Sequence, residues 1–99
     1  MTVRRIPCCV PFCRRTFKAE TDDPEEEVIC GKHWRLAPKD KRRLRATLRR
    51  RYTRNFGDNP YWIYPPGSPQ RILAVRLGTL IHKLWIRCKA AAIERAGGL

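Results

Sequence analysis

Cysteine and histidine side chains in the first third of the chain are the residues best suited to chemistry. Cys30 and His33 form one close pair, separated by two residues. Three further thiols precede them, at Cys8, Cys9 and Cys13. Thiolates and imidazole nitrogens are the ligands that zinc binds in tetrahedral sites, commonly as two close pairs. The spacing therefore predicts one zinc site, in which Cys13 is paired with either Cys8 or Cys9.

Four protein ligands complete a tetrahedron and leave no position for a reacting water, so we expect the zinc to be structural. The chain has five cysteines, an odd number that argues against a framework made only of disulfides. Its N-terminus lacks the apolar stretch of a secretory signal, and no apolar run is long enough to span a membrane. These observations predict a cytoplasmic protein whose thiols stay reduced and which has no membrane partner.

Residues 7–37 resemble the treble-clef zinc fingers. In both, a turn carries one ligand pair, a β-prone stretch follows, and a second pair lies at the start of a helix. The phrases Cys8-Cys-Val-Pro-Phe-Cys-Arg-Arg-Thr and Ile29-Cys-Gly-Lys-His-Trp-Arg-Leu-Ala-Pro are similar to those of small zinc-finger-like proteins encoded by bacteriophages and prophages. This resemblance favours Cys8 over Cys9 as a ligand and implies a bacterial host cell as the location. The implied ligand set is Cys8, Cys13, Cys30 and His33.

The elements that must position these ligands are short. Residues 15–19 and 27–29 are β-prone and flank a run that holds six of the nine acidic residues. We expect a loose hairpin that closes over this acidic loop. Its carboxylates could mimic phosphates and suppress weak, non-specific binding of polyanions.

A strongly basic helix is predicted over residues 38–54. Pro38 suits a first helical position, Asp40 suits the positive end of the helix dipole, and Asn55 and Gly57 supply a stop. The apolar stripe is narrow and consists of Ala37, Leu44, Leu48 and Tyr52.

Basic residues outnumber acidic ones throughout, with 22 Lys and Arg, 9 Asp and Glu, and a net charge of +13. Arginine dominates the basic helix, and its planar guanidinium group binds phosphate oxygens in pairs. We therefore expect a nucleic acid, DNA rather than RNA, as the partner. The predicted contacts are Lys32, Arg35, Arg42, Arg43, Arg45, Arg49, Arg50, Arg51 and Arg54.

The rest of the chain divides into a loop and a long helix. Residues 55–70 hold four prolines and several aromatic side chains, which predict an irregular loop that packs against something. Ser68 and Pro69 begin a helix that Gly97 and Gly98 end. This helix has apolar residues on two sides, so we expect it to touch more than one neighbour and to form a homodimer through residues 69–96.

No catalytic constellation is apparent. Nucleases with a treble-clef metal site need a histidine beside the metal, and the only histidine besides His33 is His82, far along the chain. We therefore expect no enzyme activity. An alternative to nucleic-acid binding is a protein-interaction module that inhibits or redirects a host defence or transcription complex.

Together these patterns predict a mostly α-helical protein with a small zinc-stabilised β-hairpin unit of treble-clef type and a long C-terminal amphipathic helix. Along the chain we expect a zinc unit with its basic helix at 1–54, an aromatic and proline-rich loop at 55–68 and the long helix at 69–99. The expected function is that of a non-catalytic phage or prophage accessory protein.

Overall fold

The computed structural model of the chain describes residues 4–97, and contacts group the chain into two compact units. The first unit combines the N-terminal segment up to Pro38 with the C-terminal segment that starts at Cys88. The second unit is the continuous stretch Lys39–Arg87. The three segments predicted along the chain stay a prediction, because they describe sequence order rather than packing.

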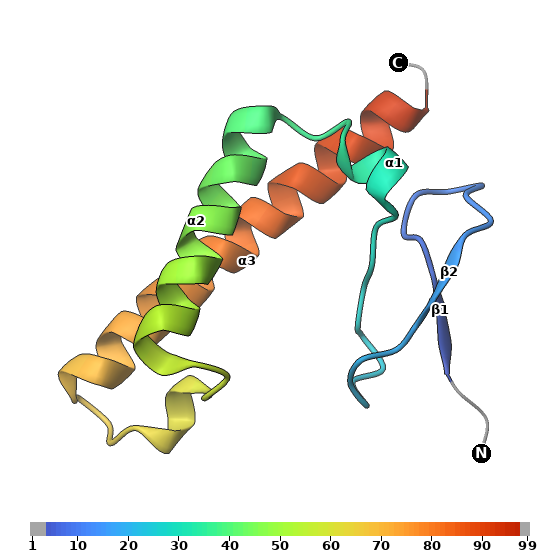
Figure 1. The fold of residues 1–99 in the computed structure, drawn as a ribbon. Coiled ribbons are helices and arrows are strands. Elements are labelled where there is room, and N and C mark those ends of the chain that lie inside the picture. The colour runs from blue at the N-terminus through green and yellow to red at the C-terminus, as the bar shows by residue number, and fades with distance from the viewer. Residues whose placement is uncertain (1–3, 98–99) are drawn as a thin grey trace. The chain divides into compact units, whose positions relative to one another are not determined.

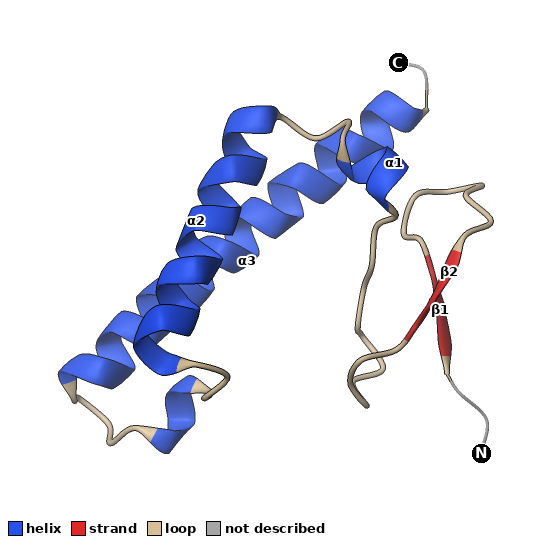
Figure 2. Ribbon diagram, in the orientation of Figure 1, coloured by secondary structure: helices blue, strands red, loops and turns tan. Residues whose placement is uncertain are grey.

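The first unit contains an antiparallel hairpin of two short strands, β1 (Arg5–Pro7) and β2 (Thr16–Lys18) (Figure 2). Ile6 lies opposite Phe17 at the centre of this pair. Pro7 stands at the end of its strand, where its missing N–H group costs no central ladder hydrogen bond.

The predicted pairing of the hairpin strands was wrong. The strand at 16–18 does form, but its partner precedes the first cysteines, and the hairpin encloses residues 8–15 instead of the acidic loop. The turn at the cysteines reverses the chain directly and brings β1 back against β2. Val28, from the predicted partner, makes only an isolated parallel bridge to Cys8.

The first unit also contains the short helix α1 (Gly31–Trp34) and the last turns of α3 (Pro69–Ala96). Most of its buried residues are small, and Ile6 of β1 is the largest of them. One cluster consists of Cys8, Val10 and Cys30, and another of Ala37, Cys88 and Ala92. Trp34 and Leu36 pack against the second cluster, so an aromatic ring fills part of this minimal core.

The second unit is a helical hairpin, in which α2 (Lys39–Phe56) lies beside the first part of α3 (Figure 1). Gly57 ends α2 as predicted, but the helix runs two residues past its predicted end at residue 54. Asn55, the other predicted stop residue, is helical, and its side-chain amide donates to the Arg51 carbonyl at 2.8 Å. Gly57 has a φ of +59° and donates its N–H to the Thr53 carbonyl at 2.8 Å, as glycine does at helix ends. The predicted start of α3 is confirmed too, since Ser68 Oγ accepts a hydrogen bond from the Arg71 N–H at 3.3 Å. Gly98, the second predicted stop of α3, lies outside the described residues.

Between these helices the chain is more regular than expected, because Tyr61–Ile63 forms a 3₁₀ turn, η1. Three residues suffice for such a turn, so the prolines on both sides do not prevent it.

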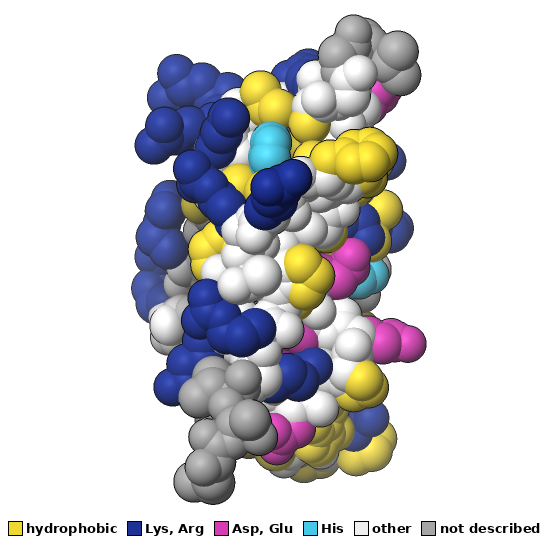
Figure 3. Space-filling model, turned by 90° about the vertical axis from the view of Figure 1, so that its right-hand side faces the viewer, with side chains coloured by type: hydrophobic (Ala, Val, Ile, Leu, Met, Phe, Trp, Pro, Cys, Tyr) yellow, Lys and Arg dark blue, Asp and Glu magenta, His cyan; other side chains and the backbone are white. Residues whose placement is uncertain are grey.

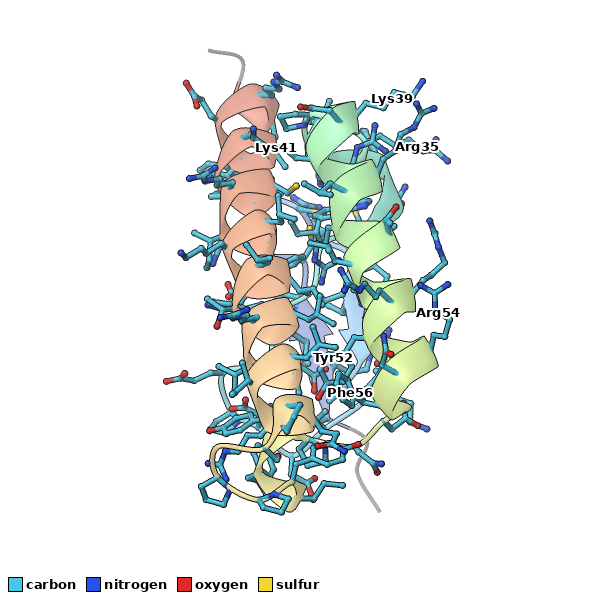
Figure 4. The ribbon with its side chains drawn as sticks, turned by 90° about the vertical axis from the view of Figure 1, so that its left-hand side faces the viewer. Arg35, Lys39, Lys41, Tyr52, Arg54 and Phe56 are labelled. Atoms are coloured by element: carbon cyan, nitrogen blue, oxygen red, sulfur yellow. The ribbon has the colours of Figure 1, made fainter. Side chains whose placement is uncertain are left out.

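The core of the second unit is aromatic and aliphatic. Phe56, Ala74 and Leu77 are buried, and Leu48, Tyr52, Tyr64, Leu73 and Ile81 pack around them. Tyr52 and Phe56 point from α2 toward α3, whereas Lys39 and Arg54 point away (Figure 4).

Two leucines depart from the predicted apolar faces. Leu44 on α2 and Leu80 on α3 are 51% and 47% exposed. Each lies to one side of the row of core residues on its helix. A helical wheel of one helix shows which residues are apolar, but not which of them meet the neighbouring helix.

The predicted fold class is confirmed. The chain is mostly α-helical, with one two-stranded antiparallel hairpin and a long C-terminal helix among the described residues. Within residues 4–97, no helix is long and apolar enough to cross a membrane.

Candidate metal centre and basic helix

Four side chains of the first unit converge on one point. The ligand atoms of Cys8, Cys13, Cys30 and His33 all lie within 4.8 Å of one another. His33 Nδ1 lies 3.2 Å from Cys30 Sγ and 3.8 Å from Cys8 Sγ, and the Sγ atoms of Cys13 and Cys30 are 4.0 Å apart. Cys8 and Cys30 are buried and the other two are half-buried. The sequence left Cys8 and Cys9 as alternatives, and the cluster includes Cys8.

Local backbone geometry places these side chains. Cys13 donates its N–H to the Val10 carbonyl at 3.2 Å, which closes a turn between the two cysteines of the first pair. Cys8 continues the β ladder through its N–H to the Arg15 carbonyl at 2.9 Å. Cys30 precedes α1, which carries His33 one turn further on. The Cys30 N–H also donates to Cys8 Sγ at 3.4 Å, a contact that joins the two pairs.

The cluster fits a tetrahedral zinc ion in both chemistry and size. Zinc–sulfur and zinc–nitrogen bonds of about 2.3 and 2.0 Å put neighbouring ligand atoms roughly 3.5–3.8 Å apart in a tetrahedron. The distances of 3.2, 3.8 and 4.0 Å scatter around this range. Three thiols and one imidazole are a common ligand set for structural zinc. The four side chains can therefore hold a metal ion and are compatible with zinc.

The thiols differ in their readiness to ionise. Burial acts to raise the pKa of Cys30, but the His33 backbone N–H and the thiols of Cys8 and Cys13 outweigh it, so this pKa lies below the usual 9.0. A metal ligand must be a thiolate, and Cys30 is predisposed to become one. Burial raises the pKa of Cys9 above 9.0, and the neighbouring Cys8 adds to that effect.

The acidic loop is organised by its own carboxylates. Glu26 accepts hydrogen bonds from the Thr21 hydroxyl and from the backbone N–H groups of Glu20 and Thr21, the latter two at 3.0 and 2.7 Å. Glu27 forms a 2.7 Å ion pair with Lys89. Glu26 thus orders the loop, and Glu27 links it to the C-terminal part of α3. The predicted role of the acidic loop as a phosphate mimic stays a prediction.

The basic helix α2 carries nine Lys or Arg residues and one acid over 18 residues. Arg43, Arg50 and Arg54 lie on its outer side: at about 100° per residue they fall within roughly 40° of one another and opposite Tyr52. All three are exposed. Among the described residues, no carboxylate lies within 4.0 Å of their guanidinium groups. On the one face drawn in Figure 3, Lys and Arg side chains cover more area than Asp and Glu side chains.

The other predicted nucleic-acid contacts differ in exposure and in the unit to which they belong. Arg49 and Arg51 are exposed on the flanks of α2, whereas Arg42 and Arg45 are half-buried. The guanidinium carbon of Arg45 lies 5.3 Å from the ring centroid of Trp85, a cation–π contact inside the second unit. Lys32 and Arg35 are exposed but belong to the first unit.

A groove in the second unit was not foreseen. It has a volume of about 910 Å³ and is bounded by the C-terminal half of α2, the segment from Gly57 to Trp62 and the middle of α3. The aromatic residues in residues 55–70 gave a signal for a contact surface. The groove itself could not be read from the sequence, because it also needs Arg49, His82 and Lys83 from two helices.

The chain has no significant match among protein family models, curated proteins or solved structures.

Proposed function

We propose that this protein is a non-catalytic, zinc-binding protein that binds nucleic acid through α2. The proposal rests on the outer row of Arg43, Arg50 and Arg54. These side chains are exposed, and none has a carboxylate partner within residues 4–97. The opposite face of the helix anchors it. The backbone of an anchored helix is already ordered, so binding costs it no further backbone freedom. Phosphate groups are the anions that match guanidinium geometry.

DNA suits this arrangement better than RNA. The major groove of B-form DNA is about 12 Å wide and admits an α-helix, whereas that of A-form RNA is deep and narrow. The outer row extends over 12 residues of α2, from Arg43 to Arg54, or about 16.5 Å at 1.5 Å per residue step. This length is enough to reach several successive phosphates.

The metal centre serves stability in this proposal. A zinc ion held by Cys8, Cys13, Cys30 and His33 would have all four positions filled by side chains and would contribute folding free energy. By the resemblance of its cysteine and histidine motifs, we also propose that the protein is a phage or prophage accessory protein.

The test is a binding titration of labelled duplex DNA, followed by fluorescence anisotropy. The triple variant Arg43→Gln/Arg50→Gln/Arg54→Gln should bind at least about tenfold more weakly and show a shallower salt dependence, because three phosphate contacts are lost. The charge-matched control Lys18→Gln/Arg76→Gln/Arg87→Gln removes three exposed cations outside α2. It should bind within about threefold of the wild type.

Equal weakening by both triple variants would mean that net charge alone attracts the DNA. No binding by the wild-type protein at low salt would refute the proposal. It would favour the alternative of an acidic host protein as the partner of α2.

A further inference from the structure

The groove of the second unit combines aromatic and cationic side chains. Trp62 is 65% exposed and Tyr61 is 42% exposed, although both rings line the groove. Arg49, His82 and Lys83 line it as well, against a single acid, Asp58. Its volume of about 910 Å³ lies in the range of roughly 300–1,000 Å³ that is typical of ligand sites.

The aromatic wall is held in place before any ligand arrives. Tyr61 and Trp62 meet edge to face, with ring centroids 5.3 Å apart and an interplanar angle of 83°. The guanidinium carbon of Arg71 lies 5.3 Å from the centroid of the Tyr61 ring. The Tyr52 hydroxyl donates to the Asn59 carbonyl at 2.6 Å, which ties the segment before Tyr61 to α2. A fixed ring loses little conformational entropy when a ligand stacks on it.

Burial of Trp62 in the core does not explain this wall. The buried cluster of the unit is formed by Phe56, Ala74 and Leu77, and Trp62 is not among the side chains packed against it. A single exposed apolar side chain is common, but Tyr61 and Trp62 form an exposed pair of large rings on one groove, and such a patch points to a ligand.

The charge of the groove selects the ligand. An apolar peptide needs no cations, whereas a nucleic acid strand offers flat bases to the aromatic rings and phosphates to the cations. Arg49 lines this groove and also a shallower one formed by α2 residues alone, with Arg50 and Arg54. The aromatic wall is thus continuous with the basic surface of α2.

We propose that this groove binds unpaired bases of a nucleic acid strand, with Trp62 as the stacking surface and Arg49 and Lys83 as phosphate contacts. This inference rests on the proposed function, because it assumes that α2 holds the same strand. It goes further in naming the ligand as nucleic acid with an unpaired segment. Base–aromatic stacking needs unpaired bases and tolerates any sequence.

The test compares three probes of equal length: a thymidine oligonucleotide, an abasic strand with the same phosphates, and a blunt duplex. The wild-type protein should bind the thymidine strand at least fivefold more tightly than the abasic strand, about the effect of one stacked base. Trp62→Ala should abolish this preference and leave duplex binding unchanged.

Ile63→Ala is the matched control. Ile63 follows Trp62 in the same 3₁₀ turn and is 52% exposed, but it does not line the groove. This variant should keep the preference for the thymidine strand. Trp62→Phe, which retains a smaller ring, should keep part of it. Helical circular dichroism checks that each variant is folded.

Failure of the inference is distinct from failure of the proposed function. Equal binding of the thymidine and abasic strands, or equal losses in Trp62→Ala and Ile63→Ala, would overturn the stacking groove while α2 still binds phosphates. A dimer that dissociates on the Trp62→Ala substitution would also overturn it, because a second copy would then fill the groove. Absence of binding to all three probes would refute the proposed function itself.

Discussion

Phe12 holds a backbone conformation that is costly for a residue with a side chain. It lies in the turn between Cys8 and Cys13 with a φ of +69°, and its side chain is fully exposed. The turn hydrogen bond from Cys13 to Val10 makes Phe12 the third residue of a four-residue turn, a position that favours glycine when φ is positive. The ring gains no packing within the described chain to offset this cost.

Replacement of Phe12 by glycine should therefore stabilise the protein. We expect a gain of about 0.5–1 kcal/mol in the free energy of unfolding, since relief of the strain exceeds the entropy lost by glycine. Urea unfolding at a fixed, saturating zinc concentration measures it. Phe12→Ala removes the ring but keeps Cβ and should give no such gain. Equal stabilisation by both variants would place the cost in the exposed ring instead of the backbone.

Glu26 makes the stability of the first unit depend on pH. Hydrogen bonds from the Thr21 hydroxyl and then from the Glu20 N–H favour its carboxylate and lower its pKa from 4.5. Because the folded pKa lies below the unfolded one, this carboxylate contributes stability above about pH 4.5 that is lost as the pH falls through the folded pKa.

The variant Glu26→Gln should accordingly be less stable than the wild type at neutral pH, and the difference should shrink on acidification. Urea unfolding of both proteins at several pH values, with zinc in excess, measures this difference. A difference that stays constant with pH would show that shape or packing, and not ionisation, is responsible.

At the scale of the elements, the two units differ in what stabilises them. The first unit buries mainly small residues around the cluster of Cys8, Cys13, Cys30 and His33. The second unit buries Phe56, Ala74 and Leu77 and has no part in the cluster. A core of small residues gains little from burial, so we expect the first unit to depend on a bound metal ion for its stability.

Removal of the metal should thus unfold the first unit selectively. On addition of a chelator, we expect amide signals from residues 5–34 to lose their dispersion in NMR spectra, while those around Phe56 and Leu77 remain. Addition of excess zinc should restore them. Simultaneous loss of both sets of signals would mean that the units fold as one.

The elements also show where sequence reasoning works. Helix boundaries were predictable because Pro38, Gly57, Ser68 and Gly97 act on their immediate neighbours. The pair of Cys30 and His33 was predictable because spacing alone brings the two side chains together, whereas spacing left Cys8 and Cys9 as alternatives. Strand pairing was not, because the partner of β2 is decided by the turn that the cysteines make. The groove at Trp62 was not predictable either, because its lining comes from three segments that are separate in the sequence.

At the scale of the whole molecule, a net charge of +13 opposes self-association and favours polyanions. Several apolar residues of α3 are nevertheless exposed, among them Ile72, Leu80 and Ile86 at 41–47%. The predicted homodimer through residues 69–96 would bury such residues. Salt should strengthen this dimer by screening like charges, but weaken nucleic-acid binding by counterion competition.

Analytical ultracentrifugation at rising salt tests this prediction. We expect the dimer fraction to increase with salt and to fall in the variant Leu80→Glu, because a carboxylate would be buried at the interface. Arg76→Glu, an exposed position one turn earlier on α3, serves as the control for added negative charge. A wild-type monomer at high concentration in every buffer would exclude the homodimer.

Metal binding by the four clustered side chains is the claim on which the account depends most. Native mass spectrometry of the purified protein and of single cysteine variants tests it directly. We predict one zinc ion per chain in the wild type and in Cys9→Ser, and loss of the ion in Cys13→Ser and Cys30→Ser. Zinc-free wild-type protein after exposure to excess zinc, or full retention of the ion in Cys30→Ser, would contradict the account.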